Sequence, residues 1–196
     1  MTSDDEAEIR ALMRAARERS RGYADFFGWA IDRDLEESGV LSSLAESMAA
    51  DGVLFYENVK SRRRPNDPPD CEATDSDGAR VAIEITELVD NEAIRAFKQG
   101  RVYDWAEWPR EKFISSLADR IAAKDKRYPD LKEPPYVGGY VVVVFSDEPV
   151  LTRSTVQEYL KDHDIPRPVH ISRAILILSY DPAIQRCPYF EVAFNG

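Results

Sequence analysis

A chain of 196 residues, 43% of them hydrophobic, is long enough to fold around one real core and barely long enough for two. Its net charge of −10 and its pI of about 4.8 argue against a generic nucleic-acid coat protein, although a local basic groove remains compatible with them. No apolar run reaches about 18 residues, so no membrane span is expected.

The first half of the chain predicts helices followed by strands. In chain order the predicted segments are a helix over 4–20, an apolar segment over 23–30 that docks it, a helix from Asp34 or Ser42 to about Met48, a strand over 53–56, and a basic, proline-containing loop over 62–69. The loop leads directly into a predicted β-hairpin.

The hairpin is predicted from the sequence Asp-Ser-Asp-Gly at 75–78. Asp-Gly flanked by alternating apolar residues is a strong short-range hairpin signal. Antiparallel pairing then brings the strand that holds Asp70 beside the strand that holds Glu84. Because side chains alternate along a strand, Glu84 and Thr86 share one face of it, while the intervening apolar residues share the other.

Two acids are therefore expected to meet at this hairpin. A carboxylate inside an otherwise apolar strand costs free energy unless it is paired or binds a cation. Asp70 and Glu84 thus offer a place where two carboxylates converge on a divalent metal ion. The alternative is that Glu84 pairs with Lys124 or with an arginine, as a buried ion pair without a metal.

The second half of the chain predicts alternating helices and strands. Pro109 suits the first turn of a helix whose apolar residues recur at helical spacing, and the run of β-branched residues over 140–145 is typical of a strand covered on both faces. The predicted elements are a helix over 109–128, a strand over 140–145, a short helix over 152–163, a strand over 174–178 and an edge strand over 189–194. The polar stretch between Val89 and Tyr103 predicts no element. The order predicts an α/β protein with a mixed central sheet flanked by helices.

This order, with Pro69-Asp70 and Glu84-Ile85-Thr86 on adjacent strands, resembles the PD-(D/E)xK nuclease superfamily. The resemblance spans roughly residues 35–180 and implies a restriction-endonuclease-like fold with an αβββαβ core. We therefore expect a single domain over 1–196, in which 1–33 forms an N-terminal helical extension packed on that core.

Thr86 departs from the family, which usually has lysine at this position. The family is known to tolerate migration of that lysine to the neighbouring helix. At about 100° per residue, Lys124 falls on the buried side of the helix predicted over 109–128, whereas Lys126 falls on the opposite side. Lys124 is therefore the candidate for the relocated lysine; the alternative is that it merely extends from the last helical turn toward solvent.

An upstream acid often completes the metal site in this family. Glu46 is the nearest candidate on a helix, Glu36 and Glu37 lie further back, Glu57 is another possibility, and spacing alone does not choose among them.

A basic cluster, consisting of Lys60, Arg62, Arg63 and Arg64, precedes the hairpin and could contact a phosphate backbone near the two acids. The alternative is that it is ordinary solvated surface.

The resemblance implies a nuclease that hydrolyses DNA or RNA with Mg²⁺ or Mn²⁺, in restriction, repair or mobile-element defence. Asp70, Glu84 and the Ile85 carbonyl would hold the metal, and Lys124 would assist the attacking water. The rival is an inactive nuclease-fold protein acting as a binding, regulatory or immunity module, which Thr86 and the low pI favour. A third possibility is an α/β protein in which the motif match is accidental.

The candidate partners are nucleic acid, through the local basic cluster, a second copy of the chain and, for the inactive alternative, another protein. No membrane is expected. The acidic N-terminus is unlike a signal peptide, and the two cysteines can form at most one bridge, so a cytoplasmic protein is expected.

Overall fold

The computed structural model describes residues 24, 33–63, 65–99, 101 and 107–195. The helix predicted over 4–20 lies outside these residues. So do the segment predicted over 23–30, apart from Ala24, and nearly all of the extension predicted over 1–33.

The described residues contain one mixed sheet of six strands, whose spatial order follows the chain. The strands are β1 (Glu57–Ser61), β2 (Cys71–Thr74), β3 (Arg80–Glu87), β4 (Gly139–Ser146), β5 (Arg173–Leu178) and β6 (Tyr189–Glu191). Strands β1, β2 and β3 pair antiparallel, β3, β4 and β5 pair parallel, and β6 runs antiparallel to β5. The predicted α/β class with a mixed sheet is confirmed.

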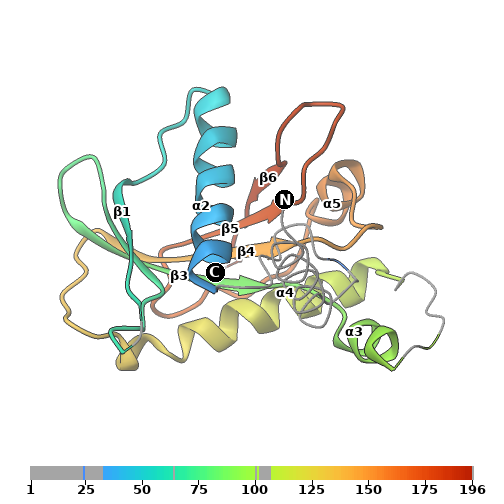
Figure 1. Ribbon diagram of the computed structural model, residues 1–196, viewed down its shortest axis with the longest axis horizontal. Coiled ribbons are helices and arrows are strands. Elements are labelled where there is room, and N and C mark those ends of the chain that lie inside the picture. The colour runs from blue at the N-terminus through green and yellow to red at the C-terminus, as the bar shows by residue number, and fades with distance from the viewer. Residues whose placement is uncertain (1–23, 25–32, 64, 100, 102–106, 196) are drawn as a thin grey trace, which may run out of the picture.

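Helices cover both faces of this sheet. They are α2 (Arg33–Ala50), α3 (Asn91–Lys98), α4 (Arg110–Asp125) and α5 (Arg153–Tyr159). Apolar residues of α2 pack on one face and those of α4 on the other, so two separate cores sandwich the sheet. Strand β1 lies at the opposite end of the molecule from α3 and α5 (Figure 1). No helix among the described residues is both long and apolar enough to cross a membrane.

The strand predicted over 53–56 is wrong, because the edge strand begins at Glu57. The chain leaves α2 through a turn in which the Val53 N–H donates to the Met48 carbonyl. Leu54 is then 83% exposed, and pairing with β2 starts only at Glu57 opposite Thr74. The apolar run is thus a connection between α2 and β1, and the partner strand, not local hydrophobicity, sets where β1 begins.

Helix α3 has no counterpart in the sequence prediction. Its N-cap is Asp90, whose side chain accepts hydrogen bonds from the N–H groups of Glu92 and Ala93. The apolar residues of α3 recur at helical spacing, at positions 93, 94, 96 and 97, although only the small residues Ala93 and Ala96 are buried. The segment therefore carries a helix signal that the sequence prediction overlooked. Helix α4 was predicted to reach 128 but ends at Asp125, since a 3₁₀ turn over Tyr128–Asp130 takes over.

The predicted hairpin is present, and its turn fixes the register of β2 and β3. The Asp75 carboxylate accepts hydrogen bonds from the N–H groups of Asp77 and Ala79, and Gly78 adopts φ of +77°, a conformation that favours glycine. Cys71 pairs with Ile83. Continuing this register by one residue places Asp70 directly opposite Glu84.

Candidate functional site

The hairpin directs the two acids toward α4. Strand β3 alternates as predicted, with Ile83 and Ile85 in the core under α2 and Ala82 in the core under α4. Glu84 faces the same side as Ala82, because the two residues are separated by two positions. Lys124, in the last turn of α4, lies over this face of the sheet and is only 7% exposed.

A buried ion cluster forms where these elements meet. Lys124 Nζ lies 3.1 Å from Asp70 Oδ2 and also donates a hydrogen bond to Glu84 Oε2. Asp70 Oδ2 accepts a second hydrogen bond, 2.8 Å long, from the Ile85 N–H. Asp70 is 3% exposed and Glu84 is fully buried. The structure therefore brings together all three residues that the sequence nominated as catalytic.

Arg127 belongs to the same cluster, and the sequence prediction did not include it. Its Nη1 lies 3.1 Å from Glu84 Oε2, while more than a third of its side chain remains exposed. The Tyr140 hydroxyl donates a 2.9 Å hydrogen bond to the Lys124 carbonyl and so ties the end of α4 to β4. Spacing offered one signal for Arg127, since it follows Lys124 by three residues. Helical spacing does not apply to Arg127, however, because α4 ends at Asp125.

Burial governs the electrostatics of Glu84. Loss of solvent raises the pKa of its carboxyl group, and the neighbouring Asp70 raises it further, while Lys124 and Arg127 oppose both effects. Glu84 Oε1 is buried and accepts no hydrogen bond from the residues that the structure describes. One carboxylate oxygen is thus held by cations, and the other retains its capacity to coordinate.

A cavity of about 340 Å³ opens beside the cluster. Its lining residues are Glu36, Glu37, Ile85, Thr86, Glu87, Lys124, Arg127 and Phe145. Two of the four upstream acids considered from the sequence, Glu36 and Glu37 on α2, therefore lie at this site. Glu46 lines a different cavity and Glu57 is exposed on the edge strand, so neither of them belongs to it.

The donor atoms suit a hard divalent cation. Mg²⁺ prefers oxygen ligands and usually takes only one or two protein carboxylates. Asp70 and Glu84 provide two, and the Ile85 carbonyl points to the same edge of β3 as its N–H, which contacts Asp70. Within the described residues, no group of three or more histidine, cysteine or acidic side chains is arranged to hold a metal. Lys124 Nζ lies between the two carboxylates, so an ion bound by both would displace it.

The basic cluster before the hairpin is divided in the structure. Arg62 donates to Glu72 at 2.9 Å, to Glu133 at 2.8 Å and to the Tyr136 hydroxyl at 3.2 Å, with its side chain 9% exposed. Arg62 is thus engaged inside the protein, whereas Lys60 and Arg63 are exposed and Arg64 lies outside the described residues. Phosphate binding by the cluster stays a prediction.

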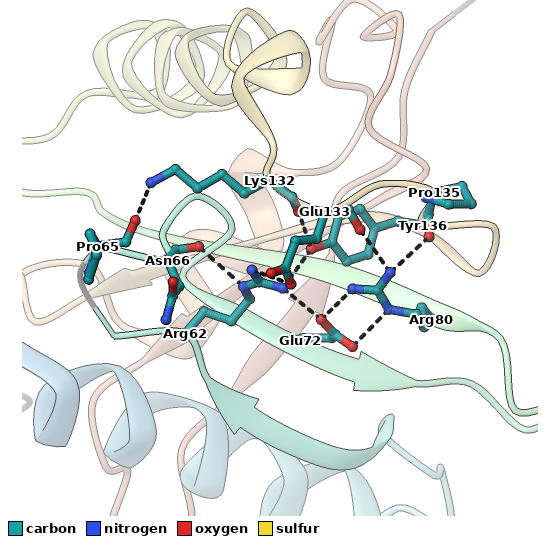
Figure 2. A network of polar contacts seen from close by, with 9 residues as sticks. All are labelled: Arg62, Pro65, Asn66, Glu72, Arg80, Lys132, Glu133, Pro135 and Tyr136. Atoms are coloured by element: carbon teal, nitrogen blue, oxygen red, sulfur yellow. Dashed lines mark hydrogen bonds and ion pairs between the residues drawn. The ribbon is translucent and has the colours of Figure 1, made fainter.

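Arg62 and its neighbours form a polar network on the hairpin (Figure 2). Glu72 lies at its centre and accepts hydrogen bonds from Arg62 and, through both carboxylate oxygens, from Arg80. Arg80 also donates to the Glu133 carbonyl, which belongs to the connection between α4 and β4. The network joins this connection to β2, two residues from Asp70 in the chain.

Replacing Glu72 by Gln is expected to make the free energy of unfolding vary less with pH in the acidic range. Hydrogen bonds from Arg80 lower the pKa of Glu72 from 4.5 to about 2, against the opposing effect of burial. A depressed carboxyl pKa stabilises the fold above pH 4.5, and this contribution is lost as the pH falls toward 2. We expect Glu72→Gln to reduce the free energy of unfolding by about 1–2 kcal/mol at pH 7 and by roughly half as much at pH 3, measured by urea titration.

Glu133→Gln is the matched control for that measurement. Glu133 also pairs with Arg62, but its side chain is 70% exposed, so its loss is expected to change stability by less than about 0.5 kcal/mol. Equal effects of the two substitutions, or a Glu72→Gln effect that does not vary with pH, would contradict a central role for Glu72.

Comparisons of the chain with protein-family models, with curated proteins and with solved structures found no match. Function is therefore inferred from the geometry of the site and from the motif resemblance.

Proposed function

We propose that the protein is a divalent-metal-dependent nuclease with a restriction-endonuclease-like core made of α2, β1, β2, β3, α4 and β4. The observation that carries the proposal is the convergence of Asp70, Glu84 and Lys124 in one buried cluster beside a cavity. The order of these elements supports the αβββαβ core that the sequence resembles, with α3 as an additional helix between β3 and α4. Lys124 would take the role of the motif lysine, since this chain has Thr86 at the corresponding position of β3.

Each residue has a defined role in this proposal. Asp70, Glu84 and the Ile85 carbonyl would hold Mg²⁺ or Mn²⁺, which when bound polarises a phosphodiester and lowers the pKa of a coordinated water. Lys124, released from the carboxylates, would orient the attacking water and offset charge on the phosphate oxygens. Arg127, which is partly exposed beside Glu84, would add a second positive charge. Glu36 and Glu37 would bound the site on the α2 side.

Asp70→Asn and Glu84→Gln are each expected to lower cleavage at least about a hundredfold, because both remove a charged oxygen ligand while conserving shape. The assay incubates plasmid, single-stranded DNA and RNA with the protein in Mg²⁺ or Mn²⁺. Glu46→Gln is the control, since this exposed acid on α2 lines another cavity. Cleavage that survives both site substitutions would contradict the proposed site.

A second candidate function is a metal-free nuclease-fold module that binds or regulates a partner. The specific observation in its favour is that Lys124 and Arg127 already neutralise the two carboxylates without a metal. Titration calorimetry with Mn²⁺ separates the two candidates. Heat of binding at micromolar to millimolar Mn²⁺ that disappears in Glu84→Gln supports the nuclease, and no binding supports the module.

A further inference from the structure

A row of aromatic rings runs from the core to the surface beside the acidic site. Tyr140 is 1% exposed, and its ring centroid lies 5.6 Å from that of Tyr128, which is 38% exposed. The Tyr128 ring stacks on His170, with centroids 4.2 Å apart and planes 3° from parallel. His170 is itself exposed, so the row ends at the surface in a flat ring.

The outer end of this row is held rigidly. The Asp125 carboxylate, at the C-terminus of α4, accepts hydrogen bonds from three consecutive N–H groups, those of Val169 (3.0 Å), His170 (2.8 Å) and Ile171 (3.0 Å). Although burial acts to raise it, these backbone bonds lower the pKa of Asp125, which keeps the anchor ionised at neutral pH. The His170 ring is therefore positioned before any partner arrives.

The surroundings of the two rings indicate the chemistry of a partner. Val169, next to His170, is 82% exposed, so the apolar surface continues past the ring. Lys126 and Arg127, the two residues before Tyr128, are exposed and partly exposed cations in a protein whose net charge is −10. A flat aromatic surface with two cations directly before it in the chain suits a planar ring that carries a phosphate.

The rings are also coupled to the candidate site. Tyr140 hydrogen-bonds the carbonyl of Lys124, and Arg127, adjacent to Tyr128, contacts Glu84. If the base of a nucleotide stacked on the His170 ring, its phosphate backbone would lie beside Lys126 and Arg127. Inside a duplex both faces of a base are covered by its neighbours, so away from the duplex ends only an unpaired base can stack in this way.

We propose that Tyr128 and His170 form a stacking surface for an unpaired nucleobase of a single-stranded nucleic acid. The proposal rests on the proposed nuclease function for the identity of the polymer, but it concerns binding and not cleavage. It goes beyond that function by assigning a preference for single-stranded over double-stranded nucleic acid and by naming two residues that determine it.

Fluorescence anisotropy with a labelled oligothymidylate of about 12 nucleotides tests the proposal, in EDTA so that no cleavage occurs. Stacking a base on an aromatic side chain contributes favourable free energy to binding. His170→Ala and Tyr128→Ala are therefore each expected to weaken binding about fivefold or more. His170→Phe, which keeps a flat ring, is expected to retain affinity. A duplex of the same length is expected to bind more weakly and to be insensitive to His170→Ala.

Tyr180→Ala is the matched control, because this exposed tyrosine lines a different cavity next to α2. Unchanged affinity in His170→Ala, equal losses in Tyr180→Ala, or no binding of the single strand would each overturn the proposal. Cleavage in Mg²⁺ is assayed separately, on the unchanged protein and on Asp70→Asn for comparison. Binding that depends on the rings, without metal-dependent cleavage, would refute the nuclease function and support the stacking surface. Metal-dependent cleavage, without binding that depends on the rings, would support the nuclease function and refute the stacking surface.

Discussion

Lys124→Met is expected to be the most damaging single substitution at the site. It removes the ammonium that lies between Asp70 and Glu84 and leaves two carboxylates buried side by side. Breaking a buried ion pair from one side typically costs about 3–5 kcal/mol, and here Arg127 and the Ile85 N–H remain as the partners of the two carboxylates. We expect a loss of this size in the free energy of unfolding, measured by urea titration at pH 7, together with at least a hundredfold loss of cleavage.

The control is Lys126→Met, two residues along the chain, where the lysine is exposed and caps α4. That substitution is expected to change stability by less than about 0.5 kcal/mol. A Lys124→Met protein as stable as Lys126→Met would contradict the ion cluster.

Mn²⁺ adds a second readout to the same variant. If the carboxylates form a metal site, Mn²⁺ at about 100 times its dissociation constant should restore roughly 2.7 kcal/mol to Lys124→Met. The absence of any restoration would favour the metal-free module.

Moving the lysine back to β3 is expected to restore much of the activity that Lys124→Met removes. Thr86 lies two residues beyond Glu84 on the same strand face and lines the same cavity as Lys124. The double variant Lys124→Met with Thr86→Lys is expected to cleave at least about tenfold faster than Lys124→Met alone. In the otherwise unchanged protein, Thr86→Lys should bring no gain, since Lys124 and Arg127 already supply positive charge there.

Thr74→Lys in the Lys124→Met background is the matched control, because it makes the same change at the far end of the hairpin. Equal rates for the two double variants, with both proteins folded by circular dichroism, would show that the position of the lysine is unimportant. That result would contradict the role proposed for Lys124.

The strongest sequence signals were local ones whose physical cause lies within a few residues. The Asp-Gly turn and the alternation along β3 sufficed to predict that the strands of Asp70 and Glu84 are neighbours, and helical spacing sufficed to predict that Lys124 faces the core. Each of these inferences depends on backbone geometry that the segment adopts by itself. They account for the sheet class and for three members of the ion cluster.

The features that sequence reasoning missed depend on contacts between distant segments. Arg62 looked like a free phosphate ligand, but its partner Glu133 is 71 residues away and reaches it only through the fold. Arg127 lies past the end of α4, where helical periodicity no longer predicts direction. The start of β1 is set by its pairing with β2, so the apolar run before it was misleading.

The turn at 75–78 gives the ion cluster an unusual dependence. Asp75 and Gly78 contribute no atom to the cluster, yet they set which residue of β3 faces Asp70. A register slip of one residue would send Glu84 to the α2 side and present an isoleucine to Lys124. In any relative of this chain, the length of that turn would therefore report on an intact site as directly as the acidic residues themselves.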